Sequence, residues 1–270
     1  MVSVESYRVR PGHEFRLDDW NPEDTGDLAS KKEGQDLLKE DRKRIAAFQE
    51  RLFAEAGQSL LIILQATDTG GKDGTIKHVF RNVNLQGCRV RNFRVPNDVE
   101  RGHDFLWRYH QHTPRNGFIV IFNRSHYEDV LAVRVKNLVE DSVWSARYEH
   151  INDFEQMLAA HGTRILKFYL HISKDEQKER LQARLDDPEK HWKFSTGDLA
   201  ERARWDAYQE AFHDAMANCS TDHAPWYVIP ANKKWFRNVL IARAVADTLE
   251  DMNPRFRDPE PGLDRVTIPD

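Results

Sequence analysis

Residues 65–75 combine glycines, a lysine and acidic side chains in an order that can hold phosphate. The segment reads Q-A-T-D-T-G-G-K-D-G-T, follows a continuous apolar run at 60–64 and precedes a helical pattern. Glycines let backbone N–H groups turn toward an anion, and the following helix presents its positive end to it. Lys72 adds a point charge. The residues predicted to bind phosphate here are Thr69, Gly70, Gly71, Lys72, Asp73, Gly74 and Thr75.

Asp68 is an acidic side chain inside this phosphate loop. It would repel a phosphate unless a cation bridges the two, so we expect it to bind Mg²⁺, with Mn²⁺ as an alternative. The general Walker A pattern is incomplete, because Ala66 replaces its first glycine and Asp73 its Ser or Thr. An ordinary glycine-rich turn is the competing interpretation, and the strand–loop–helix context argues against it.

A second motif follows the apolar run at 118–122. Asn123 and Arg124 come where this run ends, and the carboxyl ends of strands in an open α/β sheet are where ligands bind. Arg124 can fork onto phosphate oxygens, or form a structural salt bridge. Asn123 can orient water or phosphate but is no strong carboxylate ligand, which makes Glu128 a second candidate for the metal. A capping role is the alternative for Glu128.

Basic residues recur in pairs with helical spacing, which suits a long polyanion. Two pairs share a helix face at i, i+4, and two further lysines follow the second pair. Solvated helix faces are the alternative interpretation, and binding by counterion release is the functional one. The residues predicted to bind polyphosphate are Lys77, Arg81, Arg180, Arg184, Lys190 and Lys193.

Short apolar runs alternate with amphipathic segments along the chain. The alternation predicts a three-layer α/β/α domain with a mostly parallel sheet of five strands. The expected strands are 60–64, 89–95, 118–122, 165–172 and 226–229. The expected helices are 31–54, 75–83, 99–110, 130–138, 147–161, 174–185 and 234–249. The charged stretch at about 186–218 is too long for a plain connection and is predicted to form a helical lid.

Composition limits the function classes. Forty basic and 44 acidic residues give a formal net charge of -4 over 270 residues, which gives no general case for nucleic-acid or membrane binding. The two cysteines form no C-x-x-C pair, and the polar first residues contain no apolar signal segment. We therefore expect a cytoplasmic protein with two free thiols.

Four strings in this order resemble polyphosphate kinase family 2, most closely its third subclass. They are the loop A-x-D-x-x-G-K-D-G-T, the motif at 122–130, the lid string at 180–194 and the run at 224–232. The similarity spans about residues 4–253. It divides the chain into an N-terminal arm and helix (1–56), a P-loop kinase domain (57–253) and a C-terminal tail (254–270).

The resemblance implies direct in-line phosphoryl transfer between inorganic polyphosphate and AMP, ADP or ATP with magnesium. It implies that Asp68, Lys72 and Arg124 carry the reaction, and that the protein is a homo-oligomer. An ATP-dependent nucleoside monophosphate kinase is the first alternative, and a hydrolase is another if the lid fails to exclude water. Asn123 in place of the Asp of many family members supports a third, a non-catalytic polyanion-binding protein.

Overall fold

The structure, a computed structural model, describes residues 3–269 and is built on a five-stranded sheet in which every strand pair is parallel. The strands follow the order β2-β3-β1-β4-β5 across the sheet. Their bounds are β1 Ser59–Gln65, β2 Cys88–Asn92, β3 Ile119–Asn123, β4 Thr163–His171 and β5 Trp226–Pro230. The predicted five-stranded α/β fold is confirmed.

Strand β1 is central to the fold because helices cover both of its faces. All seven of its residues are buried, as its unbroken apolar run predicted. It pairs with β3 so that Leu64 lies opposite Asn123, and with β4 so that Leu64 lies opposite Phe168. The carboxyl ends of β1 and β3 are therefore neighbours, which brings the two sequence motifs to one edge of the sheet.

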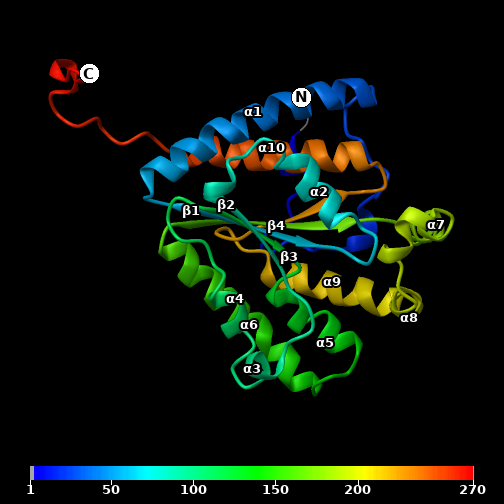
Figure 1. Cartoon of the computed structure of the whole chain (residues 1–270). Coiled ribbons are helices and arrows are strands. Elements are labelled where there is room, and N and C mark those ends of the chain that lie inside the picture. The colour runs from blue at the N-terminus through cyan, green and yellow to red at the C-terminus, as the bar shows by residue number, and fades with distance from the viewer. Residues whose placement is uncertain (1–2, 270) are drawn as a thin grey trace.

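Two helical layers enclose the sheet (Figure 1). One layer holds α1 Lys31–Glu55, α2 Lys72–Val79 and α10 Lys234–Met252, and the other holds α6 Asp141–Ala160 and α9 Trp205–Cys219. Each layer closes its own apolar core against one sheet face. The two free cysteines, Cys88 and Cys219, lie buried in these cores. No helix within residues 3–269 has the length and apolar character needed to cross a membrane.

Several helices differ from their predicted bounds for local reasons. Helix α2 begins at Lys72, three residues earlier than expected, because Gly71 adopts a left-handed conformation at its N-cap. The expected helix 99–110 is two short helices, α3 Asp98–Arg101 and α4 Trp107–His110. The Oδ1 atom of Asp104 accepts hydrogen bonds from the N–H groups of Leu106 and Trp107, which turns the chain between them. The expected helix 130–138 is reduced to α5 Ala132–Val135.

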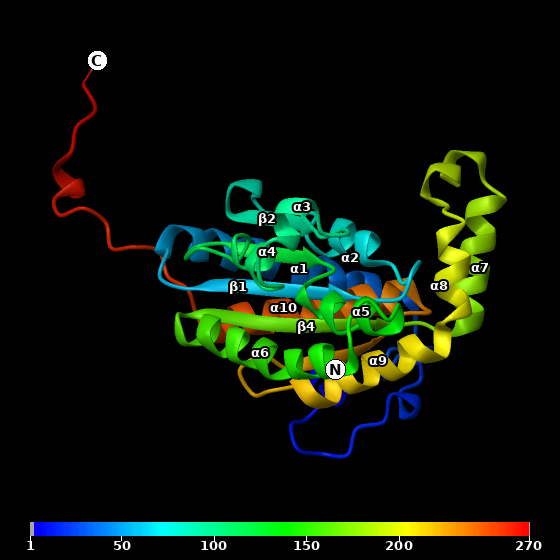
Figure 2. The ribbon, with the colours of Figure 1, turned by 90° about the horizontal axis from the view of Figure 1, so that it is seen from below.

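The lid is smaller than the predicted segment 186–218. Helix α7 Lys174–Leu185, the 3-10 turn η5 Pro188–Lys193 and α8 Gly197–Ala203 project beyond the sheet (Figure 2). Helix α9, expected within the lid, instead buries Ala211, Phe212 and Met216 in the core. An amphipathic helix has the same pattern in a lid as on a sheet, so its sequence did not separate the two.

The two ends of the chain behave differently. The N-terminal arm, with the 3-10 turns η1 Val4–Tyr7 and η2 Leu17–Asp19, packs on the body. Its Val9 N–H donates to the carbonyl of Trp226 at 2.8 Å. Beyond α10 the tail extends away from the body, as its prolines predicted (Figures 1 and 2).

Four polar side chains form a fully buried network behind the second motif. His126 and Tyr127 belong to the 3-10 turn η4 His126–Asp129, Glu155 to α6 and Lys167 to β4. The Oε1 atom of Glu155 bonds to His126 Nε2 and Tyr127 OH, each at 3.0 Å, and Lys167 Nζ donates to both Tyr127 and Glu155. Burial opposes ionisation, yet Lys167 and His126 hold the pKa of Glu155 below its ordinary value. This network anchors the turn that follows Arg124.

We predict that Glu155→Leu lowers the free energy of unfolding by about 3–5 kcal/mol, because it leaves Lys167 buried without its anion. Urea denaturation measures the change. The control is Arg164→Ala, which breaks an ion pair with Asp251 whose side chains are 47% and 67% exposed. Its cost should stay below about 1 kcal/mol. Equal losses for the two variants would show that the buried network does not stabilise the fold.

Candidate active site

The phosphate loop fills the turn between β1 and α2, and its backbone is fixed by close packing. Thr69 and Gly71 both have positive φ angles, of 64° and 103°. A Cβ atom on Gly71 would lie 1.9 Å from Nη1 of Arg237, so no side chain fits there. The fold therefore requires the glycine that the sequence motif supplies.

Arg180 of α7 lies beneath this loop. Its Nη1 donates to the carbonyls of Thr69 at 3.0 Å and Gly70 at 3.2 Å, and its Nη2 donates to that of Ala231 at 2.6 Å. The side chain is buried and also pairs with Glu176. Arg180 was predicted to bind polyphosphate directly, but its guanidinium is instead occupied in shaping the loop. The i, i+4 spacing with Arg184 did not distinguish a buried arginine from an exposed one.

Lys72 begins α2 and donates to the carbonyl of Ala66 at 3.1 Å, which holds it across the loop. Burial, reinforced by the nearby charge of Arg124, lowers the pKa of Lys72 to about 8. The carboxylates nearby, Asp68 foremost, do not supply enough negative charge to offset these two effects in the free protein. A phosphate in the loop would supply that charge and raise the pKa again.

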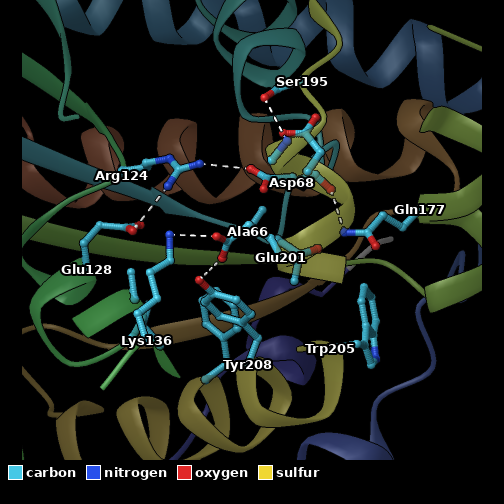
Figure 3. Close-up of a pocket in the computed structure, with 16 residues that line it drawn as sticks. Ala66, Asp68, Arg124, Glu128, Lys136, Gln177, Ser195, Glu201, Trp205 and Tyr208 are labelled. Atoms are coloured by element: carbon cyan, nitrogen blue, oxygen red, sulfur yellow. Dashed lines mark hydrogen bonds and ion pairs between the residues drawn. The ribbon is translucent and has the colours of Figure 1, made fainter. Parts of the chain in front are cut away.

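Arg124 stands at the centre of the site. Its backbone φ of 63° turns the chain sharply after β3. Its guanidinium bonds to Asp68 at 3.0 Å and to Glu128 at 3.3 Å (Figure 3). Glu128 above all, and Asp68 with it, raise the pKa of Arg124. The structure thus brings together the three residues predicted to carry the reaction, Asp68, Lys72 and Arg124.

Asn123 links the second motif to the phosphate loop. Its Nδ2 donates to Oδ1 of Asp73 at 2.6 Å. A carboxylate at position 123 would face Asp73 at this distance and repel it, whereas the uncharged amide donates a hydrogen bond to the Asp73 carboxylate. Gly74 and Thr75, which were predicted to bind phosphate in the loop, lie in the first turn of α2, and Gly74 precedes the predicted helix start at residue 75.

The donor set around Asp68 fits a magnesium ion shared with substrate phosphates. Asp68 and Glu128 point toward the same guanidinium, and Mg²⁺ is usually held by one or two carboxylates plus phosphate oxygens and water. Three loop hydroxyls, of Thr67, Thr69 and Thr75, are buried without a hydrogen-bond partner among residues 3–269. Buried hydroxyls normally have partners, so this loop is shaped for a ligand with many acceptors.

A cavity of about 230 Å³ opens beside Asp68 and Arg124 (Figure 3). The lid supplies one wall and α9 the floor. Its carboxylates are Asp68, Glu128, Asp198 and Glu201, and its apolar walls include Leu131, Trp205 and Phe212.

A contact between Lys136 and Glu201 holds the lid against the body at this cavity. Lys136 Nζ lies 2.7 Å from Oε1 of Glu201, and Tyr208 OH also donates to Glu201. Gln177 Nε2 donates to the carbonyl of Asp68 at 3.1 Å. None of these residues was predicted for the site. They carry no motif signal, because each gains its place only when the lid and α9 fold over the loop.

The predicted polyanion residues separate into two groups. Lys77 and Arg81 are exposed on α2. On the lid, Arg184 lies 3.3 Å from Asp198 and Lys190 lies 2.6 Å from Asp187, while Lys193 is exposed with its ammonium over the ring of Trp192. The lid cations therefore contact lid residues, whereas the charged groups of Lys77 and Arg81 form no ion pair within residues 3–269.

Arg42 of α1 extends the basic group on α2. It donates to the carbonyl of His78. Burial and the positive charge of Arg81 lower the pKa of Arg42. Burial, followed by Arg42, Lys77, Arg237 and Arg81, lowers the pKa of His78. Basic side chains therefore gather on the α1–α2 side of the loop, whereas both carboxylates and cations line the cavity.

These features define a P-loop kinase. The central strand of a parallel sheet leads into a phosphate loop, and a lysine, an arginine and a lid surround that loop. The sequence profile of the family Polyphosphate kinase 2 (PPK2) matches residues 28–257. The chain belongs to this family.

Known relatives are similar over nearly the whole chain. An AMP/ADP-polyphosphate phosphotransferase of Meiothermus ruber is 52% identical over 266 residues, covering 98% of this chain and all of the relative. An ADP-polyphosphate phosphotransferase of Rhodopseudomonas palustris is 39% identical, covering 96% of this chain and 94% of the relative. The crystal structure of Polyphosphate Kinase 2 from Arthrobacter aurescens TC1 has a TM-score of 0.93 at 44% identity, covering 97% of this chain and 93% of that one.

We predict that the affinity for tripolyphosphate falls as the pH rises through about 8. Lys72 loses its proton there in the free protein, since its lowered pKa is about 8. Each further pH unit should cost up to about tenfold in affinity from this residue. Calorimetric titration between pH 7 and 9.5 measures this affinity. Dividing it by the affinity of Lys72→Arg at the same pH removes the effect of the ligand's own protonation. A pH dependence that is the same in both proteins would contradict the prediction.

Proposed function

We propose that this protein transfers phosphoryl groups between inorganic polyphosphate and AMP or ADP, with ATP among its nucleotides and magnesium as cofactor. The observation that carries the proposal is the meeting of Asp68, Lys72 and Arg124 at the loop between β1 and α2. Family membership and the names of the relatives point to the same reaction. A homo-oligomeric state, a cytoplasmic location and Mn²⁺ as the alternative to Mg²⁺ stay predictions.

The cavity side suits the nucleotide. Its carboxylates, including Asp198 and Glu201, can accept hydrogen bonds from ribose hydroxyls and base amino groups. Its apolar walls, including Trp205, can pack against a base. Carboxylates would repel a bare polyphosphate chain, so the polyanion is expected on the other side of the loop.

The α1–α2 side suits polyphosphate. Lys77, Arg81 and Arg42 lie along it, and Lys234 at the start of α10 continues it toward the lid. Burial, followed by the charge of Arg180, lowers the pKa of Lys234. Such cations repel one another, and a bound polyanion stabilises their charged forms. The two substrates would then meet end to end at Lys72.

The catalytic step needs charge neutralisation more than acid–base chemistry. The attacking phosphate oxygen of AMP or ADP is already ionised at neutral pH, so no side chain has to remove its proton. Lys72 and Arg124 neutralise the phosphoryl group as it passes between the two oxygens. Asp68 and Glu128 would hold magnesium, which supplies further neutralisation when bound. The lid closes over the cavity and excludes water.

We predict that purified protein with magnesium converts AMP to ADP and ATP using long-chain polyphosphate as the sole donor. Lys72→Ala and Asp68→Asn should each lower the rate by about a thousandfold or more. The first removes a positive charge that neutralises the transferring phosphoryl group, and the second removes a carboxylate that would hold magnesium. Chromatography of the nucleotides measures the rate. Arg164→Ala, at the opposite end of the sheet, is the control and should keep full activity.

Two results would contradict this proposal. Transfer only from ATP to AMP would make the protein an ordinary nucleoside monophosphate kinase. Near wild-type activity in either loop variant would place the reaction elsewhere.

We also predict that salt weakens binding of long-chain polyphosphate more steeply than binding of AMP. The double variant Lys77→Gln/Arg81→Gln should flatten the plot of log affinity against log salt by about one to two units, by analogy with phosphate contacts in nucleic acids. The matched control, Arg255→Gln/Arg257→Gln, removes two exposed charges from the tail and should leave the slope unchanged. Equal slopes for the two double variants would exclude the α2 face as the polyphosphate path.

A further inference from the structure

Arg237 of α10 is a buried cation packed directly against the phosphate loop. Its side chain is 2% exposed. Its Nη1 occupies the space that a Cβ of Gly71 would fill, at 1.9 Å, and its Nη2 lies 3.4 Å from the corresponding position at Gly74. No sequence motif pointed to this residue, which is separated from the loop by more than 160 positions.

All hydrogen-bond acceptors of Arg237 are neutral. Its Nη2 and Nε donate to Oδ1 of Asn238 at 2.9 and 3.2 Å, and its Nη1 donates to the carbonyl of Gly70 at a long 3.4 Å. The ion pairs formed within residues 3–269 include none for Arg237, although Arg180 beside it pairs with Glu176 at 2.7 Å. Burial and the charge of Arg180 lower the pKa of Arg237 to about 9.

A buried charge is costly unless an opposite charge compensates it. Arg243, two turns further along α10, shows the ordinary solution, because it pairs with the buried Asp41 at 2.8 Å. Arg237 lacks such a partner in the free protein. The anion that would complete its environment has to come from outside the chain.

The peptide between Gly70 and Gly71 indicates where that anion binds. Arg180 and Arg237 both donate to the Gly70 carbonyl. In a trans peptide the carbonyl and the following N–H point in opposite directions. With the carbonyl held toward the two arginines, the N–H of Gly71 points away from them, toward the side on which the loop receives phosphate.

We propose that Arg237 is a positioning residue whose missing counter-ion is the phosphoryl group bound by the loop. It fixes the orientation of the Gly70–Gly71 peptide, and its charge attracts the anion across that peptide. The proposal rests on the loop being the phosphate site, as proposed above.

The test compares Arg237→Gln with wild type in two measurements made without nucleotide. The first is the dissociation constant for tripolyphosphate by calorimetry, which should rise about ten- to a hundredfold, the range for a lost charge-assisted contact. The second is the melting temperature, which should hold or rise, because the variant removes an uncompensated buried charge. Arg237→Lys keeps the charge and should restore part of the affinity.

The matched control is Arg243→Gln, on the same helix. It should lower the melting temperature, since it removes a partner of Asp41, and leave the affinity unchanged. Lys72→Ala separates this proposal from the assignment of the loop. If Lys72→Ala also binds tripolyphosphate normally, the loop is not the phosphate site.

Two results would overturn the role of Arg237 alone. One is weakened binding in Lys72→Ala with unchanged binding in Arg237→Gln. The other is a loss of both affinity and stability in Arg237→Gln that Arg237→Lys does not restore, which would identify a purely structural residue. A loss of both in which Arg237→Lys restores the affinity supports the proposal.

Discussion

The site depends first on the pairing of β1 with β3. This parallel register sets Leu64 opposite Asn123, so the phosphate loop and the second motif leave the sheet side by side. Everything that follows in the site uses this proximity: the bond from Asn123 to Asp73, and the ion pair from Arg124 to Asp68. A slip of one residue would exchange the side chains that β1 gives to the two apolar cores, so close packing in both cores fixes the register that the chemistry needs.

Charge is distributed unevenly around the loop. The cavity under the lid gathers four carboxylates, whereas α1, α2 and the start of α10 gather cations. A reaction between two polyanionic substrates has to overcome their mutual repulsion. Separate entry along two sides, with cations concentrated only where the substrates meet, lowers that repulsion and gives each substrate its own surface.

The sequence was most informative where structure is local. The run at 60–64 and the glycines after it predict a buried strand and a phosphate loop, because both follow from neighbouring residues. Arg180 and Arg237 escaped correct prediction for the opposite reason. Both donate to the carbonyl of Gly70, more than 100 positions away, and a helical spacing of basic residues is the same whether the face is buried or solvated. Helix α9 was assigned to the lid because its sequence shows that it has an apolar face, and only the tertiary structure shows that this face packs on the sheet.

Arg124 illustrates how the free protein is prepared for its ligands. In the free state its charge is balanced by Asp68 and Glu128, which also hold it in place. A phosphate that binds Arg124 competes with these carboxylates, and a metal ion beside them would release the arginine by taking over their charge. Arg237 forms no such ion pair within residues 3–269. Substrate phosphate would thus replace the internal anions of Arg124, and it would be the first anion to face Arg237. A phosphate bound at the loop, as proposed above, would meet one arginine already oriented and another already desolvated, which reduces the reorganisation left for the reaction itself.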